Sequence, residues 1–436
     1  MGAAAPMALN LAGIQAAAAQ TVVNDYRALV CVFLFGGMDQ TSTLVPFDNA
    51  EFSAMSALRG GLARPRTDFM SLGSVASQGN RSFALATELS PLANLYAQNK
   101  LSIVANVGPM SAPLTKAQFQ ARAAGVPPQL FSHNDQQSVW QSSGVEGATV
   151  GWGGRFGDLL ASNNSSNPVF TSVSINGTAV FLYGNTVQQF QVGSGGPARV
   201  SALNSLYGSS VAGQALRDIL RSNPSPLFEN HLGVVTRRSL DANAQLSDVL
   251  GQAASLQTPF PSGNSLADQL RMVARLISLR QSLGMRRQVF FVGLGGFDHH
   301  DGLLADLPGL HTQVAQAMSS FYDATVELGV ANQVTTFTAS EFGRTLTSNG
   351  SGTDHGWGGH QFVMGGAVNG GRIVGNYPTI ALNTNEDLGR GRLLPTTSTS
   401  QYAATLGTWF GVPTNLLGDA LPYINNFSVR DLGLFS

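Results

Sequence analysis

Four short apolar runs lie along the chain, at residues 28–35, 101–107, 288–294 and 333–338. They are rich in Val, Leu and Phe, and they are shorter than an ordinary helix. Continuous apolar runs of this length are typical of strands that are covered on both faces, as in a parallel sheet. We therefore predict that the four segments form buried strands, with 28–35, 288–294 and 333–338 parallel.

Two longer segments, 265–283 and 309–328, have the periodicity of amphipathic helices. In the first, apolar residues recur at spacings of four, three and four, at Leu266, Leu270, Val273 and Ile277. Helix and strand patterns alternate from 265 to 340, which favours parallel strands joined by right-handed crossovers. The predicted fold class is α/β, with a mostly parallel central sheet flanked by helices.

Residues 140–262 have a different pattern, because they are rich in Ser, Asn, Gly and Val. Short alternating runs occur at 169–175 and 178–183. Alternation of this kind is typical of half-buried antiparallel strands. We expect a single domain over 25–436, with a smaller, polar, partly β insertion around 140–262 that is inserted into the sheet or packed on it.

The first 24 residues contain no charged side chain. The Ala-rich stretch ends in Ala17-Ala18-Ala19-Gln20, which is similar to the apolar region and small-residue cleavage site of a signal peptide. A positively charged start is missing, so an ordinary N-terminal helix is the alternative. We interpret 1–24 as a truncated signal segment, which predicts a periplasmic or secreted protein. No other stretch reaches the roughly 20 apolar residues of a membrane span, so none is expected.

Composition narrows the choice of partners. Only 11% of the 436 residues are charged and the net charge is −1, so no basic surface for nucleic acid or an acidic membrane is indicated. The low charge fits either compositional drift or a protein that works outside the cytoplasm. Cys31 is the only cysteine and lies in an apolar run, so we expect a core residue.

Histidines are the clearest chemical signal. The chain has seven, and five of them fall in three short motifs that also contain acids. The motifs are Ser132-His133-Asn134-Asp135, Asp298-His299-His300-Asp301, and 354–360, which contains Asp354, His355 and His360. In a chain with few charged residues, this clustering indicates a site.

Three acids, Asp39, Asp298 and Glu341, each follow a predicted strand, behind a glycine pair or a small residue. Ligands of open parallel sheets bind beyond the carboxyl ends of the strands, so these acids should point into one cleft. Buried together without a counter-charge they would be costly, and a divalent cation removes that cost. His300, two residues after Asp298, faces the same side on an extended backbone.

Mixed carboxylate and imidazole ligation suits Zn or Mn best, with Ca or Mg less favoured as the number of histidines rises. The alternative is structural: each acid caps a helix or fixes a turn, and each histidine satisfies a hydrogen bond in the core.

Candidate catalytic residues are less well defined. Ser132, beside His133, could be a nucleophile activated by a metal, or could cap the helix that follows. Residues 41–43 are rival hydroxyls, and an activated water could replace them all. Arg344 could pair with Glu341 or bind a substrate oxyanion.

Several motifs spread over the full chain resemble one known family. They are residues 32–39, Ser132-His133, 151–155, 296–300, 340–345, 354–357 and the tail 402–434. Together they resemble the exported bacterial proteins known as domain of unknown function 1501.

That resemblance implies twin-arginine export and a relation to the alkaline phosphatase and sulfatase superfamily, which binds one or two metal ions at the carboxyl end of a parallel sheet. It implies an alkaline-phosphatase-like fold with these ligands: Asp39, Asp298, His300, Glu341 and His355, with Asp354 a ligand or a neighbour of one. Separately from this resemblance, the residues themselves make Ser132, His133 and Arg344 the candidate catalytic residues.

The function expected from this resemblance is metal-dependent hydrolysis of a phosphate or sulfate ester, in a small molecule or a surface polymer. Met38 and Gln40 stand where the family usually has Asn and Gly. This departure motivates an alternative, a non-catalytic periplasmic or surface protein that binds or assembles with an exported protein partner. A purely structural metal is a further alternative.

Overall fold

The computed structural model describes residues 25–164, 168–198, 201–222 and 227–436. The expected signal segment, 1–24, lies outside the described residues. In the part that is described, nine strands form one sheet in the order β11-β5-β10-β9-β1-β8-β6-β7, with β12 beside β5. Their bounds are β1 Arg27–Leu34, β5 Leu101–Gly108, β6 Ser172–Ser174, β7 Phe190–Gln191, β8 Arg287–Leu294, β9 Val334–Ala339, β10 Gly359–Gly365, β11 Ile373–Val374 and β12 Thr397–Ser398.

The sheet is mostly parallel, as the apolar runs predicted. The central strand β1 pairs in parallel with both β8 and β9, and β6 and β7 continue the parallel set. Strand β10 runs antiparallel to β5 and β9. All four predicted strands are present within one or two residues of their expected ends, which confirms the α/β fold class.

Alternate residues of β1 enter two separate apolar cores. Val30 and Val32 pack on one face of the sheet, whereas Leu29, Cys31 and Phe33 pack on the other. Each fully buried aliphatic or aromatic side chain contributes roughly 1.5–3 kcal/mol. A strand that is buried on both faces is therefore apolar at every position, which explains its continuous run.

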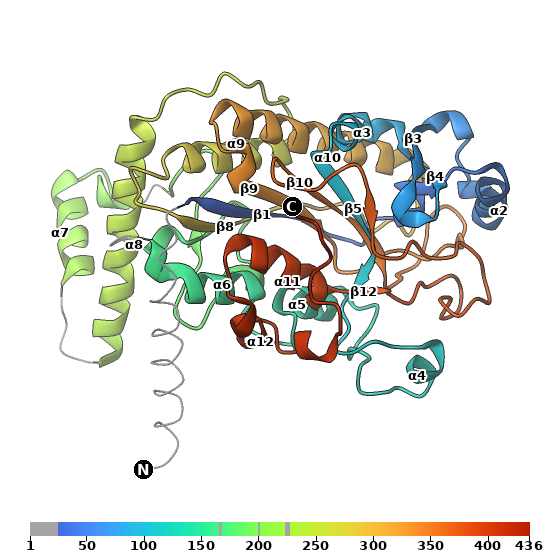
Figure 1. Ribbon diagram of the computed structural model, residues 1–436. Helices are drawn as coiled ribbons and strands as arrows, with labels where there is room; N and C mark the ends of the chain where they lie inside the picture. Colours follow the sequence, from blue (N-terminus) through green and yellow to red (C-terminus); the bar gives the residue numbers. More distant parts are fainter. Residues whose placement is uncertain (1–24, 165–167, 199–200, 223–226) are drawn as a thin grey trace, which may run out of the picture.

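Helices cover both faces of the sheet (Figure 1). On one face lie α3 Ser90–Ala97, α9 Ser265–Ser278 and α10 Leu303–Glu327. On the other lie α5 His133–Ser142, α6 Trp152–Leu160, α11 Thr399–Phe410 and α12 Leu417–Ala420. Helix α10 begins six residues before the expected 309, because Pro308 is accommodated inside it.

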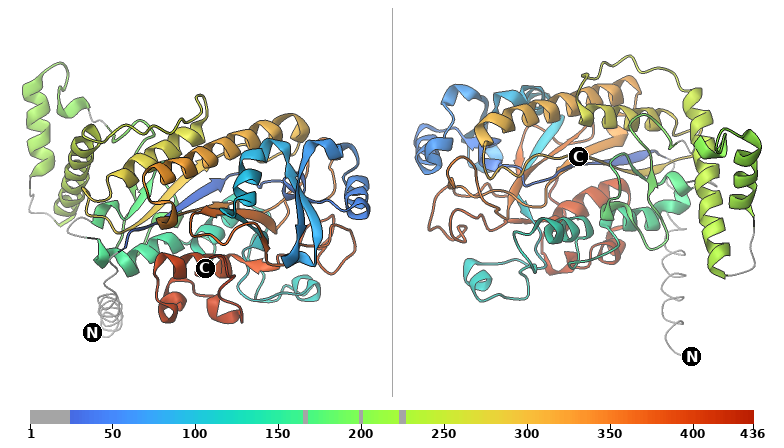
Figure 2. Two further views of the ribbon diagram at one scale, coloured as in Figure 1. Left: turned by 45° about the horizontal axis from the view of Figure 1, so that its top comes forward. Right: turned by 180° about the vertical axis from the view of Figure 1, so that it is seen from behind.

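A small antiparallel sheet is formed by β2 Leu44–Pro46, β3 Phe69–Val75 and β4 Arg81–Ala86, next to α2 Asn49–Arg59. It lies at the blue end of the molecule, beyond β5 (Figure 2). A short helix, α4 Lys116–Gln120, follows β5. None of the helices in the described ranges has an apolar stretch long enough to cross a membrane.

The antiparallel strands expected within 140–262 are a wrong prediction. The two strands described there, β6 and β7, pair in parallel and extend the main sheet. Residues Val180–Leu182 form a 3-10 turn, and much of the rest is helical, in α6, α7 Ser210–Arg221 and α8 Leu227–Gly251. The alternation in 169–175 misled because the serines of β6 are themselves buried. Serine is small enough to pack in the interior, so the polar positions of β6 are buried although the pattern predicted that they would be exposed.

Candidate metal centre

The predicted acids follow the carboxyl ends of three neighbouring strands. Asp39 follows β1, Asp298 follows β8 and Glu341 follows β9. Because β1 pairs in parallel with both of its neighbours, these three ends lie at one edge of the sheet. The expectation that the acids approach one region is therefore met at the level of the backbone.

A glycine pair allows the loops to approach closely. A Cβ on Gly36 would lie 2.3 Å from the backbone nitrogen of Asp298, and one on Gly37 would lie 2.6 Å from the ring of Phe342. Both glycines have positive φ, at 119° and 87°. Only glycine adopts this backbone without strain, so the pair brings the loop after β1 against the loops after β8 and β9.

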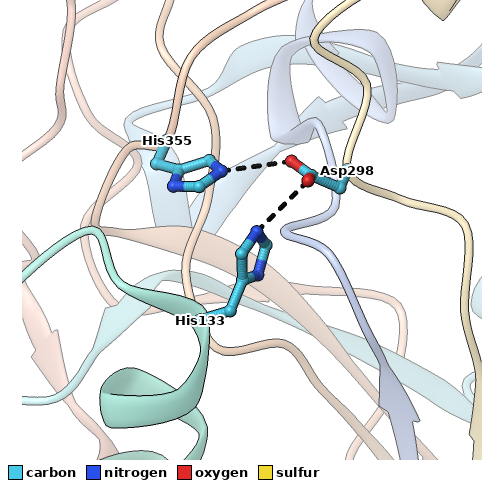
Figure 3. A group of neighbouring side chains, drawn as sticks. All are labelled: His133, Asp298 and His355. Atoms are coloured by element: carbon cyan, nitrogen blue, oxygen red, sulfur yellow. Dashed lines mark hydrogen bonds and ion pairs between the residues drawn. The ribbon is translucent and has the colours of Figure 1, made fainter.

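His133, Asp298 and His355 form the group of side chains that could hold one metal ion (Figure 3). One ligand atom from each lies within 4.8 Å of the others. His355 Nε2 is 3.1 Å from Asp298 Oδ1, and His133 Nε2 is 3.3 Å from Asp298 Oδ2. The Asp298 side chain is 43% exposed, so the cluster is open to solvent.

Three separate segments supply this cluster. Asp298 lies in the loop after β8, and His355 lies in the loop between β9 and β10. His133 is the first residue of α5, and its ring points from this helix toward Asp298 (Figure 3). The sequence placed all three among the candidates, with His133 as a catalytic residue, and in the structure His133 lies in one group with the two predicted ligands.

Both histidines have their second ring nitrogen fixed by an acceptor. His133 Nδ1 lies 2.8 Å from Glu341 Oε1, and His355 Nδ1 lies 2.6 Å from the carbonyl oxygen of Phe131. A carboxylate and a carbonyl can only accept, so each Nδ1 carries the proton. In a neutral imidazole the facing Nε2 is then an acceptor. Histidine ligands of metals are commonly oriented in this way.

Phe342 holds the two rings in place. Its ring stacks on His355 at a centroid distance of 4.5 Å and lies 4.9 Å from the ring of His133. The residue is buried, so neither imidazole can rotate freely. Nothing in the sequence pattern indicated this contact.

The cluster thus brings two imidazole nitrogens against one carboxylate. The buried His133 Nε2 has no hydrogen-bond partner although Asp298 is near, whereas His355 Nε2 lies within hydrogen-bond distance of Asp298. A proton on an Nε2 lets it donate to the carboxylate, and in place of that proton a divalent ion could be bound by the same three groups. Two nitrogens and a carboxylate fit Zn or a similar transition metal best.

The charges around Asp298 keep it ionised. Burial raises the pKa of this carboxyl, but hydrogen bonds from Arg344 and His355 and the charges of Arg344 and His133 outweigh it, so the net pKa is lowered. For the histidines, the Glu341 hydrogen bond raises the pKa of His133, whereas burial lowers the pKa of His355.

Arg344 pairs with Asp298 and not with Glu341. Its Nη1 lies 2.8 Å from Asp298 Oδ1 and 3.1 Å from the Gly36 carbonyl, and its Nε lies 3.2 Å from Thr353 Oγ. The side chain is fully buried. The Gln40 side chain also binds the Arg344 backbone. Its Oε1 accepts from the Arg344 N–H at 2.7 Å, and its Nε2 donates to the Arg344 carbonyl at 2.6 Å.

His300 and Asp354 lie at the edge of the cluster. His300 Nε2 is 2.9 Å from His355 Nε2 and 3.1 Å from Asp298 Oδ1, so it could supply a fourth donor. Asp354 Oδ1 lies 3.7 Å from His300 Nδ1, and its other oxygen pairs with Arg390 at 3.1 Å. Asp354 therefore lies beside His300 but too far from its ring for a hydrogen bond.

Glu341 and Asp39 do not join the cluster. Glu341 Oε1 accepts from His133, from the Gly36 N–H at 2.9 Å and from Gln137 at 3.1 Å, which makes it a support for a ligand. Asp39 is buried and pairs with Arg59 at 3.1 Å. The pairing of Arg59 with Asp39 could not be predicted from the sequence, because Arg59 lies on α2, outside the motifs that contain the acids.

The hydroxyl groups that are candidate nucleophiles differ in their hydrogen bonds. Ser132 stands at the N-cap position of α5 without a side-chain capping bond. Ser42 Oγ accepts from Arg59 at 3.1 Å, and Thr43 Oγ donates to the Asp39 carbonyl at 2.7 Å. Ser132 is thus the candidate next to the cluster whose hydroxyl is not used in capping.

Two histidines of the sequence motifs are core residues. His360, on β10, accepts from the Asn106 N–H at 3.1 Å, and burial lowers its pKa to about 3. His299 is buried with neither ring nitrogen hydrogen-bonded in the described structure, and burial lowers its pKa.

A family model described as "Protein of unknown function (DUF1501)" matches residues 26–420. No curated protein matches the chain.

Similar solved structures include Ps i-CgsB in complex with k-i-k-neocarrahexaose, at 8% identity and a TM-score of 0.37, covering 92% of this chain and 77% of that one. The lipoteichoic acid synthase LtaP from Listeria monocytogenes is similar at 8% identity and a TM-score of 0.31, covering 93% and 78%. The C-terminal periplasmic domain of EcEptC from Escherichia coli is similar at 8% identity and a TM-score of 0.35, covering 95% and 87%. At these scores, neither activity nor ligand is carried over to this chain.

Proposed function

The chain belongs to the DUF1501 family, and on this premise we propose that it is a metal-dependent hydrolase of phosphate or sulfate esters. In this proposal His133, Asp298 and His355 hold one divalent ion, with Zn or Mn as the favoured metals. The observation that supports it most is the convergence of two imidazole nitrogens and a carboxylate on one solvent-exposed point.

Three protein donors are the number found in catalytic zinc sites, where a further position stays open for water or substrate. A bound divalent cation would supply a Lewis acid that polarises an ester oxygen. The chain's own residues prepare the place for it. Arg344 keeps Asp298 ionised, and Glu341 and the Phe131 carbonyl set the tautomers of the two histidines.

Ser132 is the proposed nucleophile, because it immediately precedes His133 at the start of α5. The N–H groups of the first helical turn and the helix dipole favour an anion at this end, which suits a phosphate or sulfate group. We propose a small-molecule ester or a surface polymer as substrate, and an exported location, which the uncharged Ala-rich residues 1–24 support.

A second candidate is a non-catalytic protein with a structural metal ion. His300 Nε2 lies close to His355 Nε2 and Asp298, so it could complete a closed four-ligand site. Structural zinc sites have four protein ligands and no open position. Such a protein would need its ion for stability and would not turn over esters.

One experiment separates these readings. The purified chain is analysed for bound metal and assayed against a panel of aryl phosphates and aryl sulfates, beside an Asp298→Asn variant. The matched control is Asp268→Asn, an exposed acid on α9 that pairs with Arg271.

Hydrolysis is supported if the wild type and the control hold metal and turn over an ester while Asp298→Asn loses both. Bound metal without turnover, together with a lower melting temperature after chelation, would favour the structural role. A folded wild type that takes up no metal would refute both.

A further inference from the structure

Asp39 was expected to bind metal, yet its carboxylate is already satisfied by the protein. The side chain is buried, at 1% exposure. Its Oδ1 accepts from the Ser42 N–H at 2.7 Å, which starts the short 3-10 turn Gln40–Ser42. Its Oδ2 accepts from Arg59 at 3.1 Å and from Thr353 Oγ at 3.4 Å. Each oxygen therefore has a donor.

Arg59 reaches Asp39 from helix α2. It is the last residue of α2 and is only 2% exposed. One guanidinium nitrogen binds Asp39 and Ser42 Oγ, and the other lies 3.3 Å and 3.5 Å from two carbonyl oxygens of the loop after β9. These carbonyls belong to Thr345 and Leu346.

The two acids of the neighbouring strands are arranged alike. Asp298 has the buried guanidinium of Arg344, and Asp39 has that of Arg59. Thr353 lies between the two pairs, because its Oγ contacts Arg344 Nε at 3.2 Å and Asp39 Oδ2 at 3.4 Å. The difference is that Asp298 also faces two histidines, whereas Asp39 belongs to no ligand group found among the described residues.

We infer that Arg59 takes the position of a second cation beside Asp39, so that the chain binds a single metal ion, at Asp298. The inference rests on the proposed metal site and corrects the ligand role that the family resemblance implied for Asp39.

The physical reason is that a guanidinium cannot lose its proton. A metal ion at Asp39 would have to displace Arg59 and would leave a second positive charge buried beside it without a partner. Removing one member of a buried ion pair is strongly destabilising, because the other charge stays uncompensated. Asp298 also has a buried guanidinium, but its Oδ2 faces His133, and His355 completes a ligand group there. At Asp39 both oxygens already have protein donors, and this residue belongs to no ligand group among the described residues, so a further cation lacks ligands.

The test measures metal stoichiometry and affinity on the full chain, after chelation and titration with Zn²⁺ and, separately, Mn²⁺. The variants are Asp39→Asn, Arg59→Ala and the double variant, with Asp298→Asn as the control that should lose the ion. Circular dichroism confirms that each variant is folded.

We expect one ion per chain in the wild type. Loss of a residue that supports a metal ligand weakens metal binding by roughly tenfold or more. In Asp39→Asn, the Kd for the metal should therefore change by less than roughly tenfold. Arg59→Ala frees the Asp39 carboxylate and should bind a second ion, which the double variant should lose again. Should Arg59→Ala fail to fold, the affinity of Asp39→Asn decides the question.

Two ions in the wild type, or a greater than roughly tenfold loss of affinity in Asp39→Asn, would overturn the inference and leave the metal site standing. A folded Arg59→Ala that binds only one ion would overturn it as well. No ion in the wild type would overturn the inference together with the proposed function, so the two failures are distinguishable.

Discussion

Replacing Glu341 by Gln isolates the support that one carboxylate gives to a metal ligand. The side chain is fully buried, and its Oε1 accepts from His133 Nδ1, from the Gly36 N–H and from Gln137 Nε2. Gln has the same shape and keeps an acceptor oxygen at this position. The substitution therefore removes the negative charge and leaves the packing nearly unchanged.

The expected loss follows from this geometry. With the carboxylate gone, His133 Nε2 becomes a poorer donor to a cation, because its Nδ1–H no longer binds an anion 2.8 Å away. Outer-shell partners of this kind are worth about 10- to 100-fold in metal affinity, which is about 1.4–2.7 kcal/mol. We expect Glu341→Gln to weaken Zn²⁺ binding by this factor.

The assay is a competition titration of Zn²⁺ against a chromophoric chelator. The control is Glu88→Gln, a carboxylate that pairs with Arg64 at 2.7 Å and contacts none of the three ligands. The control should lose a little stability and keep the wild-type Kd. Equal Kd values for Glu341→Gln and the wild type, with both folded, would refute the reasoning that Glu341 acts through His133.

Three further results are expected. In metal-free protein, the pKa of His133 is raised by Glu341, so the stability that this pair contributes is full below the unfolded value of about 6.5 and is lost as pH rises through the higher folded pKa. Thermal melts across this range should show that loss, and an identical pH profile in Glu341→Gln would contradict it. A Cβ at Gly36 would lie 2.3 Å from the Asp298 nitrogen at a φ of 119°, so Gly36→Ala should cost at least about 1–3 kcal/mol in denaturant unfolding. Gly61→Ala, where a Cβ meets no atom within 4 Å, is its control, and equal losses would count against a role for close approach. Free Zn²⁺ at about 100 times its Kd should stabilise the chain by about 2.7 kcal/mol, and a melting temperature that is insensitive to chelation would argue against a bound ion.

Much of the fold could be predicted from local pattern. Strands β1, β5, β8 and β9 were located because burial on both faces makes most of their positions apolar. The strands within 140–262 were wrongly expected to be half-buried and antiparallel, since the buried serines of β6 have the same pattern as half-exposed ones. A sequence pattern shows which positions are polar, and it predicts which are buried only where the buried positions are also the apolar ones.

The sequence by itself determined where the candidate site lies. Acids that follow parallel strands must reach the same edge of the sheet, and clustered histidines pointed to the same loops. Which donors meet was decided only by the tertiary structure. Glu341 supports His133 from 208 residues away, and Asp39 pairs with Arg59 of α2. A carboxylate binds whichever cation or N–H group the packing brings within about 3 Å, and that partner is not encoded in its neighbours along the chain.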